Sequence, residues 1–260
     1  MADLSNIQLL LIALIFIWSG FVRSGLGFGG AALALPLLLL VVNNPLLFLP
    51  IISIQLLIFS SWIAWRGYRS SKRLAQTTGQ AQEGNIDWVY LKQSMKIIIV
   101  PKMLGVLGLL TLPPAWVSII IFCMISVFAV TYILNKPFKS KSRWADIFFL
   151  AMGGYFSGTS LIGAPLIVAV FASHVARHQL RDTLFVLWFI LVLIKMTSFI
   201  VAGVDLQWVG QLWLFPAALI GHLLGTKFHD YIQTKNQAAF FRVVGVALLT
   251  VCLLGIVGNI

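Results

Sequence analysis

The sequence predicts an all-α integral membrane protein made of two inverted-topology repeats, each a glycine-broken helical hairpin followed by three transmembrane helices. Of its 260 residues, 60% are hydrophobic and 10% are charged, whereas soluble domains average roughly 25% charged residues. A soluble domain of this length has too little core for so many apolar side chains, so the bilayer must act as their solvent. The apolar runs are continuous rather than alternating, which excludes the strands of a membrane barrel.

Nine apolar segments follow one another, most of them about the 20 residues that a helix needs to cross the hydrocarbon. They cover residues 7–22, 26–42, 46–65, 97–112 (or from Trp88), 115–134, 145–172, 183–204, 208–228 and 238–257. The segment 145–172 is long and carries small and polar residues between Ser157 and Pro165. We therefore expect two short helices that meet there at a break. The polar connection 66–87 is expected to be a flexible cytoplasmic loop.

The basic side chains predict how the chain is oriented. They gather in four connections, at Arg66, Arg69, Lys72 and Arg73, at Lys136, Lys139, Lys141 and Arg143, at Arg177 and Arg181, and at Lys227 and Lys235. The other connections and both termini carry no Lys or Arg. The positive-inside rule then places the basic loops in the cytoplasm and both termini outside it, in a multi-pass protein of the cell (inner) membrane. Lipid headgroups account for the net charge of +11 without a nucleic-acid partner.

The two halves of the chain repeat one another, with residues 1–135 as the first repeat and 136–260 as the second. Gly25 and Gly30 in the first half are spaced like Gly158 and Gly163 in the second. Later in each half comes a proline with spaced glycines, in the segments 101–108 and 216–225. The charge topology starts the first half outside and the second inside. The halves are then inverted repeats, as in many secondary transporters, with a site where the two breaks meet near the midplane.

Three glycine-rich stretches carry a family resemblance. They are Gly-Leu-Gly-Phe-Gly-Gly at 25–30, Gly-Thr-Ser-Leu-Ile-Gly-Ala-Pro at 158–165, and the segment 215–230. Together they resemble the sulfite exporter TauE/SafE family over nearly the whole chain. This resemblance implies a membrane transporter of small anions, a class that includes sulfite and organosulfonates.

Three cations away from the basic loops are candidates for a site: Arg23, Lys102 and Lys195. At 1.5 Å per helical residue, Lys102 is on the order of 15 Å from Lys92 and therefore deep in the bilayer. A charge there costs at least about 2.5–3.5 kcal/mol, and no Asp or Glu lies deep in any segment to offset it. A bound anion is the simplest counter-charge. The alternatives are that Arg23 reaches the cytoplasmic face and that either lysine is neutral.

Uncharged groups beside these cations complete the predicted substrate site. A helix that begins at a break directs free N–H groups and its positive end at an anion, and glycine lets backbone approach a ligand. The candidates are Gly27, Gly29, Gly30 and Gly163 for backbone contacts, and Gln55, Ser157, Thr159 and Ser160 for side-chain hydrogen bonds. The alternative readings are that the glycines permit close helix packing and that the hydroxyls bond helix backbone.

The remaining motifs do not indicate a cofactor, metal or catalytic site. The glycines at 25–30 have the Gly-x-Gly-x-x-Gly spacing of a dinucleotide-binding motif. No strand is expected before them, however, and no acidic residue follows at the required distance. His174 and His178 have a metal-binding spacing without a third ligand. His222 is an intramembrane group that can carry a proton, with packing as the alternative. We predict no catalytic residue, metal or cofactor.

These observations favour a secondary transporter, expected to export a small sulfur-containing oxyanion such as sulfite or an organosulfonate by alternating access. An anion channel is one alternative. A membrane enzyme acting on a phosphorylated lipid is another, although it needs a base and nucleophile set that the sequence does not offer. The expected partners are the small anion and the lipid bilayer. A homodimer through Gly221-x-x-x-Gly225 and packing of this motif within one protomer both remain open.

Overall fold

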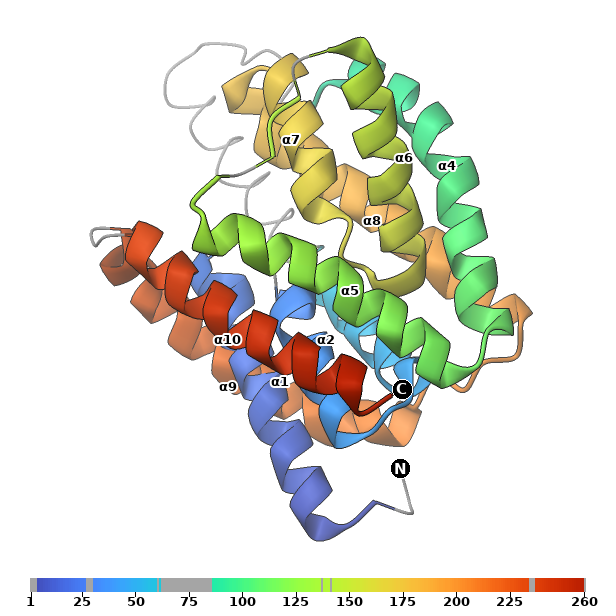
Figure 1. Cartoon of the computed structure of the whole chain (residues 1–260), viewed down its shortest axis with the longest axis vertical. Helices are drawn as coiled ribbons and strands as arrows, with labels where there is room; N and C mark the ends of the chain where they lie inside the picture. The colour runs from blue at the N-terminus through green and yellow to red at the C-terminus, as the bar shows by residue number, and fades with distance from the viewer. Residues whose placement is uncertain are drawn as a thin grey trace, which may run out of the picture.

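The computed structural model describes residues 4–26, 30–59, 61, 86–136, 138–140, 142–233 and 237–259. Throughout these ranges the regular secondary structure is α-helical, and no strand occurs in them (Figure 1). The predicted all-α class is therefore confirmed. Gly27, Gly29 and nearly all of the connection 66–87 lie outside the described residues.

The helices are α1 (Asn6–Leu26), α2 (Gly30–Val41), a helix at Pro45–Phe59, α4 (Trp88–Thr111), α5 (Pro114–Ile133), α6 (Arg143–Ser160), α7 (Ala164–His174), α8 (Arg177–Val201), α9 (Trp208–Gln233) and α10 (Gln237–Val257). Among the described residues, five helices are long and apolar enough to cross a membrane: α1, α4, α5, α8 and α9. At 12 residues, α2 is only about 18 Å long and cannot cross by itself. The structure thus supports a multi-pass membrane protein.

Two helices begin earlier than their apolar segments suggest. α4 begins at Trp88, the earlier of the two starts considered from the sequence, because Asp87 caps it by accepting a hydrogen bond from the Tyr90 N–H at 2.9 Å. α8 begins at Arg177 rather than near residue 183. The early turns of both helices carry polar side chains, at residues 92–94 in α4 and 177–179 in α8, so hydropathy alone places the start too late.

The predicted break within 145–172 is confirmed. α6 ends at Ser160, and Leu161 follows in the left-handed conformation with φ of 65°. α7 starts at Ala164 after Gly163, and Pro165 occupies its first turn, where a missing N–H costs nothing. The chain therefore turns inside the molecule and leaves the end of one helix beside the start of the next.

The main helix pairs each join the two halves of the chain. α1 packs along α9, α4 along α6, and α5 along α10 (Figure 1). Numbering the helices from the start of each half makes α1 equivalent to α6 and α4 equivalent to α9. Exchanging the halves therefore converts the α1–α9 pair into the α6–α4 pair and leaves α5–α10 unchanged, as expected for two related repeats.

Glycine permits the close approach in both exchanged pairs. A Cβ on Gly158 of α6 would collide with the Lys102 carbonyl of α4, and one on Gly221 of α9 would collide with the Ile17 carbonyl of α1. Gly221, the first glycine of the 221–225 motif, is thus used for packing within the protomer.

Candidate functional site

Two buried lysines converge on the last turn of α6, beside the second break. Lys102 of α4 donates from Nζ to Ser157 Oγ at 3.1 Å and lies 3.5 Å from the Ser157 carbonyl. Lys195 of α8 donates to the Thr159 carbonyl at 3.1 Å. Both lysine side chains have 0% exposure. The structure therefore brings together four predicted site residues, Lys102, Ser157, Thr159 and Lys195.

The end of α6 explains how these cations are held. The last carbonyls of a helix lack partners within the helix and form its negative end. This end amounts to roughly half an elementary charge, which is less than the charge of one ammonium group. Among the described residues, an ion pair forms between His174 and Asp146 at 2.9 Å. Asp146 lies in the first turn of α6, at the other end of the helix from the lysines. In the part of the chain that the structure describes, no carboxylate pairs with either lysine.

The neighbouring hydroxyls are already engaged with helix backbone. Thr159 Oγ1 donates to the Tyr155 carbonyl at 3.1 Å, and Ser160 Oγ donates to the Phe156 carbonyl at 3.0 Å. This is the alternative expected of Ser and Thr in a membrane helix. Ser157 differs, because its oxygen accepts from Lys102 and its O–H remains a donor. Of the three hydroxyls, Ser157 is the one hydrogen-bonded to a lysine.

Arg23 occupies the last turn of α1, beside the first break. Its Nε and Nη1 atoms are buried, and neither has a hydrogen-bond partner among the described residues. Its Cζ lies 4.8 Å from the centre of the Phe59 ring. A Cβ on Gly30, the first residue of α2, would lie 3.3 Å from Nε, so the guanidinium faces the positive end of α2. A cation thus lies beside the positive end of a helix.

Gln55 lies one turn before Phe59 on the helix Pro45–Phe59, and therefore on the same face. It has 0% exposure, and neither Oε1 nor Nε2 has a hydrogen-bond partner in the described structure. Leaving a buried polar atom unpaired costs about 1–3 kcal/mol.

A histidine that the sequence left open also lies near Arg23. His222 Nδ1 of α9 is hydrogen-bonded to Ser24 Oγ of α1, and its ring centre lies 5.1 Å from that of Phe59. Phe59 in turn stacks on Phe215 at 5.5 Å. Sequence reasoning missed Ser24 and Phe59, because neither residue type in an apolar run points to a site.

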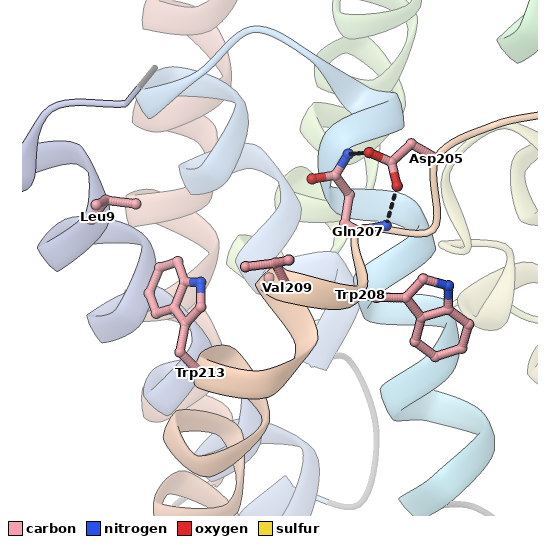
Figure 2. Close-up of a pocket in the computed structure, with 7 residues that line it drawn as sticks. Leu9, Asp205, Gln207, Trp208, Val209 and Trp213 are labelled. Carbon is pink, nitrogen blue, oxygen red and sulfur yellow. Dashed lines mark hydrogen bonds between the residues drawn. The ribbon is translucent and has the colours of Figure 1, made fainter. Parts of the chain in front are cut away.

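A separate hollow of about 730 Å³ opens where the start of α9 meets α1 (Figure 2). It is lined by Leu9, Asp205, Gln207, Trp208, Val209, Gly210 and Trp213. None of the predicted site residues lines it. Asp205 accepts hydrogen bonds from the Gln207 N–H at 2.8 Å and from its Nε2 at 2.7 Å (Figure 2). A carboxylate in this position disfavours anions, so the hollow is not the predicted site.

An all-α membrane fold with a helix break and buried cations has the features of a secondary transporter. The family model described as sulfite exporter TauE/SafE matches residues 11–254, which is nearly the whole chain. The chain therefore belongs to the sulfite exporter TauE/SafE family and is a membrane transporter rather than an enzyme. No curated protein and no solved structure matches it.

Proposed function

We propose that this protein is a secondary transporter that exports a small sulfur-containing oxyanion, such as sulfite or an organosulfonate, across the cell (inner) membrane by alternating access. Its family supports the class of substrate. The single observation that carries the proposal is Arg23, whose buried Nε and Nη1 atoms have no partner among the described residues. A guanidinium binds oxyanions through paired N–H donors, and these donors are unoccupied.

The proposed anion site lies near the midplane, between the two breaks. The first break contributes Arg23, the N–H groups at Gly27, Gly29 and Gly30, and the Gln55 amide. The second contributes Lys102, Lys195 and the Ser157 hydroxyl. Thr159 and Ser160, whose hydroxyls bond backbone, contribute through the α6 turn that they form, and Gly163 contributes through the start of α7.

Alternating access follows from the proposed inversion of the halves. If residues 1–135 and 136–260 are inverted repeats with both termini extracytoplasmic, exchanging their conformations converts an outward-open state into an inward-open one. The exchange of the α1–α9 and α4–α6 pairs between halves supports this arrangement. The anion would stay between the breaks while the helix pairs tilt around it.

A binding experiment tests the site. Thermal unfolding of the detergent-purified protein is measured with sulfite, sulfate, thiosulfate, taurine, sulfoacetate or acetate, and binding to the folded state raises the melting temperature. We expect selective stabilisation by a sulfur oxyanion, lost in Arg23→Gln and retained in Lys96→Met, which changes an exposed cation of α4. Equal stabilisation in Arg23→Gln and in the unmodified protein would refute the site.

A further inference from the structure

The helix pair α1–α9 holds a titratable side chain at the place where the pair α4–α6 holds Lys102. The offset that takes Gly25 to Gly158 and Gly30 to Gly163 also takes Ser24 to Ser157. Ser157 of α6 accepts from Lys102 of α4, and Ser24 of α1 is hydrogen-bonded to His222 of α9. Because α6–α4 corresponds to α1–α9, His222 is the counterpart of a cation.

Phe59 connects this histidine to the proposed anion site. The Arg23 Cζ lies 4.8 Å from the ring centre of Phe59, and the His222 ring centre lies 5.1 Å from it. The guanidinium and the imidazole are therefore at most about 10 Å apart, since these two distances add. With protein rather than water between them, charges at this separation influence one another strongly.

Three helices meet at His222: α1, α9 and the helix Pro45–Phe59. Arg23 is the charged residue of α1, and the helix Pro45–Phe59 has none. α9 carries Lys227, which is exposed, and His229 and Asp230 about two turns after His222. An arginine stays protonated at any physiological pH. While Arg23 has no anion, its charge opposes a second positive charge on His222. An anion bound to Arg23 removes that opposition.

We propose that His222 takes up a proton when an anion binds at Arg23, so that anion and proton move together through the transport cycle. This inference rests on the proposed function of Arg23. The proton comes from solvent and adds to an imidazole nitrogen, which leaves an imidazolium beside the bound anion. Ser24 can donate to neutral Nδ1 or accept from protonated Nδ1–H, so its hydrogen bond serves both states.

The linkage is reciprocal: if the anion favours protonation, protonation must tighten anion binding by the same factor. A charge pair about 10 Å apart at an effective dielectric constant of about 20 gives roughly a tenfold effect. The affinity of the folded protein for the anion is therefore expected to be about tenfold higher at acidic than at alkaline pH.

The test measures proton uptake and anion affinity of the full chain in weakly buffered detergent solution between about pH 5.5 and about pH 8.5, the range in which histidine titrates. Sulfate and methanesulfonate are the probes, because their own charges do not change in this range. We expect proton uptake on binding in the unmodified protein. His222→Asn, whose side-chain amide can replace Nδ1 as the partner of Ser24, should bind at all pH values with the alkaline affinity and take up no proton.

His174→Asn is the control, because His174 pairs with Asp146 at the other end of α6, and it should behave like the unmodified protein. Anion binding without proton uptake in the unmodified protein would overturn the inference, even if His222→Asn failed to fold. Proton uptake that persists in folded His222→Asn would also overturn it. If Arg23→Gln binds either probe as tightly as the unmodified protein, the anion site itself is wrong. If Arg23→Gln abolishes binding while no proton is taken up, the inference about His222 alone fails.

Discussion

At the scale of single residues, the main question is what balances Lys102 and Lys195. Both side chains are completely buried, and their ammonium groups donate to the end of α6. Carbonyl dipoles solvate ammonium groups without neutralising them, and the proposed site supplies an anion as the counter-charge. A purely structural pair would cap α6 and have no effect on anion binding.

Replacing either lysine by methionine separates these two roles. Lys195→Met keeps the approximate volume of the side chain and removes a charge whose burial costs desolvation free energy. We expect the anion-free variant to unfold at the same temperature as the unmodified protein or higher, and its anion affinity to fall at least about tenfold, the effect of losing about 1.4 kcal/mol.

The matched control is Lys96→Met on the exposed face of α4, which should change neither quantity. A large loss of stability in anion-free Lys195→Met, with anion affinity intact, would assign the lysine a structural role and contradict the proposed site.

The predictability of the site differs from residue to residue. The burial of Lys102 and Lys195 could be predicted, because cations in the middle of long apolar runs have few other places to go. Ser157, whose hydroxyl accepts from Lys102, was among the predicted site residues. The partner of Lys195 could not be predicted, because it is the backbone carbonyl of Thr159, and every residue has such a carbonyl. Ser24 and Phe59 could not be predicted either, because their contacts with His222 and Arg23 form only when α1, α9 and the helix Pro45–Phe59 pack together.

At the scale of elements, the contact between α4 and α6 positions the lysine site. The ideal Cβ of residue 158 would fall against the Lys102 carbonyl, so a side chain there would push α4 away from α6. The distance between Lys102 and Ser157 depends on this close packing.

Gly158→Ala is therefore expected to destabilise the protein by about 1–3 kcal/mol, the usual cost of overpacking, and to weaken anion binding. Gly108→Ala on α4 is the control, because an added Cβ there meets neighbours at ordinary contact distances of 3.8 Å and 4.0 Å. Thermal unfolding of both variants measures the difference. Equal stability of the two would show that the α4–α6 contact can relax without cost.

The helices themselves were largely predictable, and their ends were not. Apolar runs and glycine breaks indicated the hairpin of α6 and α7, because glycine and proline act through local backbone geometry. The start of α8 was predicted too late, because its polar first turn extends beyond the apolar core. The start of α4 was left open between residues 88 and 97, and the structure places it at Trp88. For α4 the N-cap residue Asp87 is a better guide to the start than hydropathy. α8 has no side-chain cap.

At the scale of the whole molecule, the charge pattern predicts the orientation of the chain. Lys139 lies in a connection expected in the cytoplasm, and Asp205 lies in one expected outside. Both side chains are exposed, so both positions are open to reagents in water.

Single cysteines at these positions test the orientation, after the native Cys123 and Cys252 have been replaced. We expect a membrane-impermeant maleimide to label Asp205→Cys in intact cells that express the protein, and to label Lys139→Cys only after the membrane is permeabilised. The reverse pattern would place both termini in the cytoplasm, and labelling of both sites in intact cells would refute a single fixed orientation.

The central claim is that a sulfur oxyanion crosses this membrane protein by alternating access through a site that needs Arg23. Its most direct test is counterflow in proteoliposomes, in which unlabelled sulfite inside should accelerate the uptake of radiolabelled sulfite from outside. We predict saturable, transient accumulation of label in liposomes with the unmodified protein, and none with Arg23→Gln. Flux that rises in proportion to the sulfite gradient and is not accelerated by internal sulfite would contradict the claim and indicate an anion channel.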